Sequence, residues 1–220
     1  MEKFIHLDEC DSTQDVLKEQ LSIDESQSYI IGCEKQTKGH GRNGKIWNDS
    51  LGTICFSFNM PAHSKPSFSA LEVSILIRKF FLTKNVDVKV KWPNDLINIH
   101  KKKCSGILIQ NYKDQYLAGI GLNLYLDDEN FGGIYESDFP IIKKEWIYDI
   151  SSFILKNRYQ DTNELIKDWN EGCIHLNKEV TITENEIATK GIFLGLGEYG
   201  EALINTDQGI QKIFNGSLRF

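Results

Sequence analysis

Six residues between two predicted strands, Gly39-His40-Gly41-Arg42-Asn43-Gly44, restrict the fold more than any other feature of the sequence. They satisfy the G-x-G-x-x-G pattern, which in a dinucleotide-binding fold follows a strand and opens a helix. Here no helical period follows Gly44, and the next regular element is the β-branched and aromatic run at 53–58, which predicts a strand. The glycines therefore belong to a loop that joins two strands, which argues against a Rossmann fold.

The same loop nearly forms a P-loop, because Gly39, Gly44 and Lys45 match G-x-x-x-x-G-K, but Ile46 replaces the hydroxyl residue that binds magnesium. Residues 35–45 contain no acidic side chain, and their basic side chains are those of Lys35, Lys38, His40, Arg42 and Lys45. Such a loop can hold a phosphate or a carboxylate through backbone N–H groups and a guanidinium. The alternative is a solvated basic turn.

The overall charge narrows the classes of function. The 220 residues include 25 Lys and Arg against 31 Asp and Glu, which gives a net charge of -6. Nonspecific nucleic-acid binding depends on neutralising phosphates, so this acidic total argues against it. Charged residues interrupt every apolar run before the ~20 residues that a membrane helix needs, and the N-terminus has no apolar signal region. We expect a cytoplasmic protein that does not enter a membrane.

Cysteine and histidine spacing excludes two other kinds of site. The five cysteines stand far apart with no C-x-x-C pair, and the five histidines include no H-E-x-x-H pair. We therefore expect reduced thiols and no metal held by the side chains of the protein.

Hydrophobic periodicity predicts an α+β fold. Strands are expected at 2–8, 29–34, 53–58, 86–90, 96–99, 104–112 and 116–124, and helices after the N-cap candidates at 11–15, at 67–83, at 143–157 and at 161–172. Short strands at 179–183, 188–196, 201–205 and 209–214 form a small β unit that must pack on the larger part, because it is near the size at which isolated domains are marginal. We expect a mixed sheet with flanking helices over 1–175 and a second domain over 176–220.

A second basic cluster surrounds Trp92-Pro93-Asn94-Asp95, which places an amide and a carboxylate between two strands. The lysines of this cluster are Lys89, Lys91, Lys101, Lys102 and Lys103. A charged strand face with an ordinary Asx turn is the plain alternative.

Together and in this order, the motifs resemble the catalytic region of biotin protein ligases. The resemblance rests on five segments, at 11–14, 36–47, 91–96, 103–108 and 119–123, and covers nearly the whole chain. The tail that ends Gly216-Ser217-Leu218-Arg219 is similar to the small SH3-like barrel of that family. The resemblance implies a catalytic domain like that of class II synthetases, followed by this barrel.

The resemblance also implies a reaction. Biotin and ATP would be the substrates, with Mg2+ arriving on ATP, and biotinyl-5'-AMP the intermediate. A lysine of a biotin carboxyl carrier protein, in acetyl-CoA carboxylase or a related carboxylase, would accept the biotin. No nucleophile of the enzyme is needed, which agrees with the lack of an evident Ser-His-Asp or Cys-His arrangement, and catalysis would rest on positioning and charge stabilisation.

Carried over residue by residue, the resemblance places Ser12, Thr13 and Gln36 at the ureido head of biotin. Ser12 and Thr13 equally suit a helix N-cap. The glycines of the loop would let the backbone close over the ligand, Arg42 would meet the carboxylate or phosphate, and Trp47 would be a wall of the site. These glycines are Gly39, Gly41 and Gly44.

The remaining carried-over residues lie downstream. Lys103 would neutralise charge on the carboxylate and α-phosphate. Asn94 and Asp95 would organise the phosphate and metal side, and Asp95 could also orient or deprotonate the acceptor lysine, whose ordinary pKa is near 10.4. Close approach of the ligand to the sheet would be permitted by Gly106 and Gly121, and Asn123 would touch the nucleotide. The catalytic set is thus Lys103, Arg42 and Asp95.

The chain departs from the family pattern in its glycine loop. His40, Asn43 and Lys45 stand where arginine is common, so retention of the adenylate is in question. Only eleven residues precede Ser12, too few for the winged-helix domain of bifunctional members, and we expect no repressor function and no DNA binding. The segment 127–140 would order over the adenylate, with Phe131 or Phe139 stacked on adenine, or else be a plain acidic linker.

Three rival functions follow from the same residues. A ligase for lipoate or another acyl group would run the same chemistry, although Trp-Pro-Asn-Asp and the loop arginine favour biotin. A non-catalytic biotin-binding regulator is the second rival, against which Arg42 and Lys103 argue, and a nucleic-acid binder is third. The protein could be a monomer or a homodimer.

Overall fold

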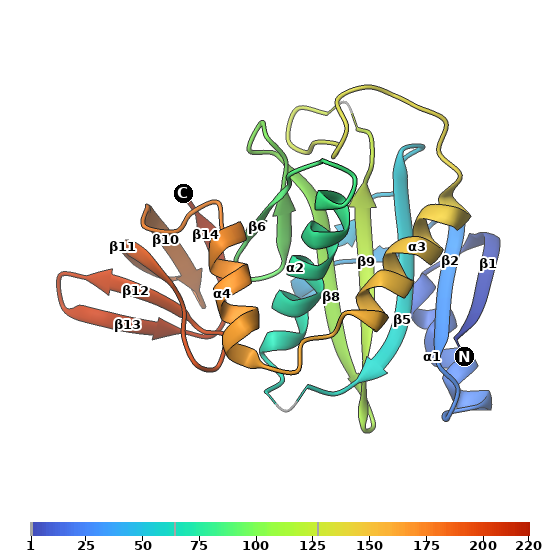
Figure 1. Cartoon of the computed structure of the whole chain (residues 1–220), viewed down its shortest axis with the longest axis horizontal. Coiled ribbons are helices and arrows are strands. Elements are labelled where there is room, and N and C mark those ends of the chain that lie inside the picture. Colours follow the sequence, from blue (N-terminus) through green and yellow to red (C-terminus); the bar gives the residue numbers. More distant parts are fainter. Residues whose placement is uncertain (1, 64, 127) are drawn as a thin grey trace.

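A seven-stranded sheet carries most of the chain in the computed structural model (Figure 1). The structure describes residues 2–63, 65–126 and 128–220, and the side chain of Asn43 also lies outside the described part. In spatial order the strands are β1 (Lys3–Cys10), β2 (Tyr29–Gln36), β5 (Thr53–Pro61), β9 (Gln115–Asn123), β8 (Lys103–Tyr112), β7 (Asp95–Ile97) and β6 (Lys89–Lys91). β1 pairs parallel with β2 and the other neighbours pair antiparallel. The prediction of a mixed sheet is confirmed.

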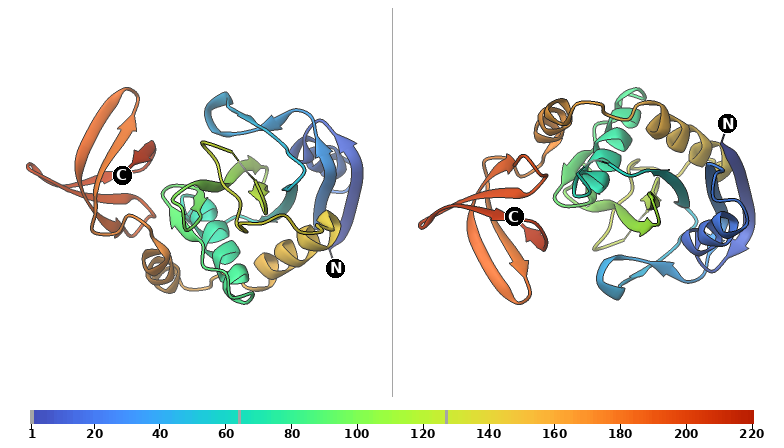
Figure 2. Two further views of the ribbon diagram at one scale, coloured as in Figure 1. Left: turned by 90° about the horizontal axis from the view of Figure 1, so that it is seen from above. Right: turned by 90° about the horizontal axis from the view of Figure 1, so that it is seen from below.

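Alternation along the strands gives the sheet two different faces, because successive side chains point to opposite sides. On β5, Ile54, Phe56 and Phe58 join the main core beneath α2 (Phe68–Leu82) and α3 (Lys143–Lys156). Leu17 and Leu21 of α1 (Thr13–Ile23) pack in a separate cluster with Ile31 and Leu117. Figure 2 shows α2 and α3 on one side of the sheet and the hairpin of β3 (Gly39–His40) and β4 (Ile46–Trp47) on the other.

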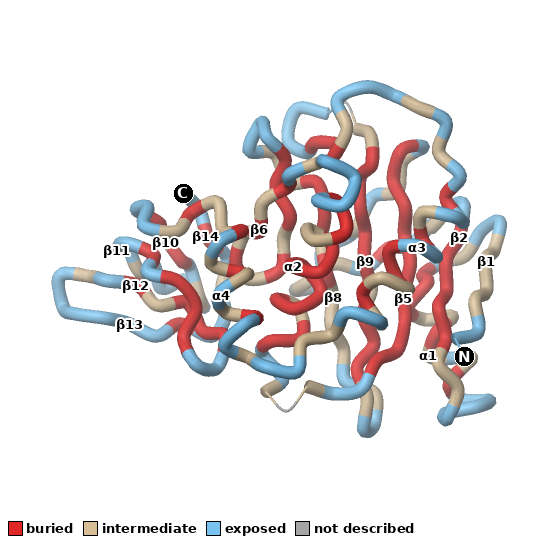
Figure 3. The backbone as a smooth tube through the Cα atoms, viewed as in Figure 1, coloured by how far each residue is buried: buried red, intermediate tan, exposed pale blue. Residues whose placement is uncertain are grey.

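The face that looks toward this hairpin is lined by small residues at the centre of the sheet. Ser57 pairs with Gly119, and Gly106 pairs with Gly121, across β5, β9 and β8. β5 is buried over all but its last residue (Figure 3). The sheet therefore has a closed core on the helical side and, on the other side, a floor of small residues that another group can approach closely.

The C-terminal part is a five-stranded antiparallel sheet in the order β13 (Gly209–Ile213), β12 (Ala202–Thr206), β11 (Ile187–Leu196), β10 (Glu179–Glu184) and β14 (Ser217–Arg219). One core joins it to the larger part through α4 (Thr162–Gly172), since Phe68 and Trp92 share a cluster with Trp169 and Phe193. The expected small β unit, packed against the larger part, is confirmed and is consistent with a barrel-like domain. The boundary at 175 and 176 stays a prediction.

Three details differ from the predictions. The alternating run 86–90 forms a strand only as β6, because its partner β7 is three residues long and the pairing ends at Lys89 with Ile97. β14 was not predicted, since three residues show no period, yet it pairs with β10 at Ile182 and Leu218. The glycine loop contains the β3–β4 hairpin and a 3-10 turn at Arg42–Gly44, where we expected irregular structure.

Two findings concern the described residues as a whole. None of their helices has the length and apolar content to cross a membrane. Nor do they bring together three His, Cys, Asp or Glu side chains in a geometry that could hold a metal ion.

His175 is a buried imidazole between α4 and the C-terminal sheet, and it predicts a pH dependence of stability. It is 0% exposed, its ring centroid lies 4.3 Å from that of Phe193, and neither ring nitrogen has a hydrogen-bond partner among the described residues. Burial, with help from the charges of Lys91 and Lys178, lowers the pKa of His175 to about 3. The folded state therefore holds this ring neutral.

Because the unfolded chain takes up this proton near the ordinary pKa of about 6.5, the free energy of unfolding should fall as the pH drops below that value. The expected loss from this group is about 2 kcal/mol between pH 6.5 and 5. Urea unfolding of wild type and His175→Leu at both pH values checks it. The variant should lose less stability than wild type on acidification, and an equal loss in both proteins would contradict the assignment.

Candidate active site

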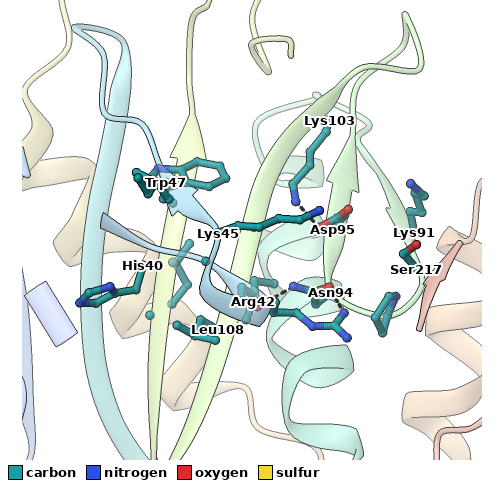
Figure 4. Close-up of a pocket in the computed structure, with 18 of the residues that line it drawn as sticks. His40, Arg42, Lys45, Trp47, Lys91, Asn94, Asp95, Lys103, Leu108 and Ser217 are labelled. Atoms are coloured by element: carbon teal, nitrogen blue, oxygen red, sulfur yellow. Dashed lines mark hydrogen bonds and ion pairs between the residues drawn. The ribbon is translucent and has the colours of Figure 1, made fainter. Parts of the chain in front are cut away.

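A cavity of about 430 Å³ lies over the small-residue face of the sheet (Figure 4). Its walls come from α1, the β3–β4 hairpin, the turn at 92–95 and the last strand, β14. A pocket of this size is typical of small-molecule sites. Most of the residues selected from the sequence line it, namely Ser12, Thr13, Gln36, Gly41, Arg42, Trp47, Asn94, Asp95, Lys103, Gly106 and Gly121.

One end of the cavity is lined by the uncharged polar side chains of Ser12, Thr13, Gln36 and Ser57. Gln36 Oε1 accepts from the backbone N–H of Thr13 at 2.9 Å and from its hydroxyl at 3.3 Å, and that hydroxyl lies 2.9 Å from Ser57 Oγ. Ser12 occupies the N-cap position of α1 but its side chain makes no capping hydrogen bond. Its hydroxyl and the amide nitrogen of Gln36 have no protein partner among the described residues, so both are available to a ligand.

Trp47 lies flat against the glycines of the floor. A Cβ on Gly121 would come within 2.1 Å of its indole, and one on Gly106 within 3.0 Å. Any other residue at Gly121 would push the ring away from the sheet. Gly39 does not line the cavity, but a Cβ there would meet the carbonyl oxygen of Trp47 at 2.4 Å, so this glycine is needed to close the hairpin.

The other end of the cavity is cationic. Arg42 Nη1 donates to Asn94 Oδ1 at 2.7 Å and Nη2 to the carbonyl of Gly216 at 3.5 Å. Lys103 Nζ lies 2.6 Å from Asp95 Oδ1. In Figure 4 the side chains of Arg42 and Lys103 extend toward the turn that carries Asn94 and Asp95.

Two further cations, Lys91 and Arg219, line the same end. Burial lowers the pKa of Arg42, against the opposing effect of Asp95, and burial also lowers the pKa of Lys91, with Lys103 and Arg219 adding to the effect. Both shifts arise mainly because the positive charges are partly removed from water, and at Lys91 the neighbouring cations add to the effect. This end of the cavity would therefore be stabilised by an anionic ligand.

Two residues that were candidates for contact with the nucleotide, Asn123 and Phe139, do not line the cavity. Asn123 does not line the cavity: it is 3% exposed, its Oδ1 accepts from Thr53 at 2.9 Å and its Nδ2 donates to the carbonyl of Gly132 at 3.5 Å. Its amide ties β9 to the segment after 128, so this geometry does not support the prediction that Asn123 touches the nucleotide, which stays a prediction. Phe139 packs against Trp146 on the helical side, with ring centroids 6.1 Å apart, whereas Phe131 lines the cavity.

Of the three residues that stand where arginine is common in the family, two are found at the cavity. Both His40 and Lys45 line the cavity, and His40 Nε2 lies 3.0 Å from Asp15 Oδ2. The side chain of Asn43 and all of Asp127, the first residue of the predicted covering segment, lie outside the described part of the chain.

Sequence reasoning missed several lining residues. Ser57 had a findable signal, since it alternates with the apolar residues of β5 and must face the floor. Lys91 stood in the second basic cluster but was not selected. Arg219 and the backbone of β14 had no local signal, because only the packing of the C-terminal sheet brings them to the cavity.

Comparison with known proteins shows which family the chain resembles. The model of the Biotin/lipoate A/B protein ligase family matches residues 7–127. The biotin protein ligase of Aquifex aeolicus, solved in complex with biotin and ATP, is 29% identical with a TM-score of 0.83, over 99% of this chain and 98% of that one. The bifunctional ligase/repressor BirA of Bacillus spizizenii is 20% identical, over 97% of this chain and 73% of its own length.

Part of the chain also matches a plant relative, biotin--protein ligase 2 of Arabidopsis thaliana, which is 28% identical over 54% of this chain and 39% of its own length. The family match covers the loop, the turn and the glycine floor, which build most of the cavity, but not β14. This chain therefore belongs to the biotin/lipoate A/B protein ligase family.

Proposed function

We propose that this protein is a biotin protein ligase, which forms biotinyl-5'-AMP from biotin and ATP and transfers biotin to a lysine of a biotin carboxyl carrier protein. The observation that carries the proposal is the polarity of one cavity, neutral and hydrogen-bonding at Ser12, Thr13 and Gln36 and cationic at Arg42 and Lys103. Biotin has the same polarity, with a ureido ring at one end and a carboxylate at the other.

The neutral end supports biotin over lipoate. Ser12 Oγ and Gln36 Nε2 can bond to the ureido group, whereas a dithiolane ring would leave them buried and unpaired. Sites built to hydrogen-bond a substrate reject analogues that lack the polar group far more strongly than apolar pockets reject a missing methylene. We therefore propose biotin as the substrate, and lipoate as the alternative that the experiment below must exclude.

In the first step, a carboxylate oxygen of biotin attacks the α-phosphorus of ATP, and the bond to the pyrophosphate leaving group breaks. Negative charge that moves between these groups is met by Lys103 and Arg42 at the cationic end. Preorganised charges of this kind act without reorganisation during the reaction. Binding in one cavity would hold both substrates close enough for in-line attack.

Magnesium enters as part of the ATP substrate. Mg2+ is usually held by one or two carboxylates together with substrate phosphates rather than by a protein cage. Asp95 supplies one carboxylate at the cationic end, which suits that mode.

In the second step, the ε-amine of the acceptor lysine attacks the acyl carbon, a C–N bond forms and AMP leaves. An unperturbed lysine with a pKa near 10.4 is largely protonated at neutral pH, so a proton acceptor helps. Asp95 is the carboxylate that lines the cavity, and we assign it this orienting and proton-accepting role.

We also propose that the segment 128–140 covers the adenylate and shields it from water. Gly132 N–H donates to the carbonyl of Lys103 at 3.0 Å, which brings Phe131 to the cationic end. Action in the cytoplasm as a monomer or homodimer, without DNA binding, stays a prediction.

The test is pyrophosphate release from ATP with biotin, with lipoate and with neither. We expect release with biotin only. Pyrophosphate release that depends on lipoate would show that the protein is a lipoate ligase. Tight biotin binding without pyrophosphate release would show that it is a non-catalytic regulator.

A further inference from the structure

A buried ion pair lies behind the neutral end of the cavity without lining it. Lys143 Nζ is 3.8 Å from Asp49 Oδ1, and the two side chains are 7% and 6% exposed. Asp49 follows the β3–β4 hairpin, and Lys143 is the first residue of α3. None of the catalytic steps above uses either residue, yet a buried pair of charges carries a desolvation cost that geometry must offset.

Asp49 and Lys143 each make a hydrogen bond to the backbone of β2 near its C-terminal end. Asp49 Oδ2 accepts from the backbone N–H of Gln36 at 2.7 Å, and Lys143 Nζ donates to the carbonyl of Glu34 at 2.5 Å. Residues two apart on a strand present their backbone groups along the same edge. The two side chains therefore act on one edge of β2.

β5 does not pair with this edge of β2 beyond Cys33. β2 pairs with β5 only from Ile30 to Cys33, whereas on its other edge it pairs with β1 as far as Gln36. Asp49 and Lys143 take the place of the missing ladder for the N–H of Gln36 and the carbonyl of Glu34. Because the side chains of Asp49 and Lys143 are buried, they supply these two backbone groups with hydrogen bonds away from water.

Gln36 connects this edge to the ligand. Its side-chain oxygen is occupied by Thr13, and Thr13 in turn contacts Ser57, so the amide nitrogen is the part that faces the cavity. A shift of the backbone at Gln36 would therefore change the positions of the Gln36 and Thr13 side chains. Burial raises the pKa of Asp49, against the bond from Gln36 and the charge of Lys143.

We propose that Asp49 and Lys143 are positioning residues, which hold the end of β2 so that Gln36 and Thr13 meet the head group of biotin. This inference rests on the proposed function. It assigns to the pair an effect on the affinity for biotin that is separate from the chemistry at Arg42 and Lys103.

The experiment compares Asp49→Asn, Lys143→Met and the double variant with wild type in biotin-dependent pyrophosphate release. Asp49→Asn should raise the KM for biotin about tenfold, the effect of weakening a charge-assisted hydrogen bond. The KM for ATP and kcat should stay within about twofold, since the cationic end is untouched. The double variant removes both charges, so its biotin KM should be lower than the product of the two single effects predicts.

Lys35→Met is the matched control, because it breaks an exposed pair with Glu9, 2.9 Å apart, on the residue next to Gln36. It should behave as wild type. Thermal unfolding checks the fold of each variant. If Lys143→Met does not fold, the neutral double variant still decides the matter, since it should fold and keep a raised biotin KM.

Two results would overturn the inference alone: a folded Asp49→Asn with the biotin KM of wild type, or one in which the KM for ATP and kcat change as much as the KM for biotin. A wild-type protein whose pyrophosphate release does not depend on biotin overturns the proposed function, and the positioning role with it.

Discussion

Lys103→Met should lower biotin-dependent pyrophosphate release by about 100-fold or more, the usual effect of removing one preorganised charge from a reacting centre. Lys103 begins β8, lines the cationic end of the cavity and reaches Asp95 with its ammonium group. Methionine keeps an unbranched stem beside Trp47 but cannot offset charge on the α-phosphate. The loss should appear in kcat more than in the KM for biotin, because the charge is needed most in the transition state.

Lys101→Met is the control for this prediction. Lys101 lies two residues away, is exposed and does not line the cavity, so its loss should leave the rate within about twofold. Because the Lys103 side chain is 32% exposed, its replacement should not unfold the protein. A folded Lys103→Met with the turnover of wild type would remove this lysine from the catalytic set.

Arg42→Ala should lower kcat/KM for ATP by about 100-fold and should release adenylate into solution. The guanidinium joins three parts of the site, since it belongs to the glycine loop, bonds to Asn94 and reaches the carbonyl of Gly216 in the C-terminal domain. Arg42→Lys should recover only part of the activity, because a lysine cannot make both contacts at once. The measurement is the ratio of pyrophosphate released to biotin transferred, which should rise in Arg42→Ala as the intermediate escapes.

Lys38→Ala serves as the control, because Lys38 belongs to the same loop but is 72% exposed and pairs with Asp11 at 2.8 Å. Its ratio of release to transfer should match wild type. An unchanged ratio in Arg42→Ala would show that adenylate retention rests on other contacts, such as those of Lys91 and Arg219.

Much of the fold could be predicted because its elements are long and strongly periodic. β8 and β9 are long strands joined by a short polar turn, and α2 and α3 repeat apolar residues at helical spacing. β6 and β14 were misjudged or missed because three-residue strands are defined by their partners, and partners are distant in sequence. The hairpin in the glycine loop was not predicted for the same reason, since each of its strands has two residues.

The site was predictable where a residue type implies its chemistry, and not where packing decides. Arg42, Asp95 and Lys103 line the cavity, as the motifs shared with biotin protein ligases implied. Asn123 looked equally suited to a ligand, but its amide is buried and holds Gly132, a choice that only the fold of the 128–140 segment reveals. Arg219 enters from the C-terminal sheet, and no local pattern could place it.

The measurement that tests the proposed ligase most directly is the mass of a biotin carboxyl carrier domain after incubation with the protein, ATP, magnesium and biotin. We predict a gain equal to biotin less one water, and no gain when the acceptor lysine is replaced by arginine or when Lys103→Met is used. An unchanged carrier mass, alongside biotin-dependent pyrophosphate release, would contradict the transfer step. The mass of lipoate in place of biotin, when both are supplied, would contradict the choice of substrate.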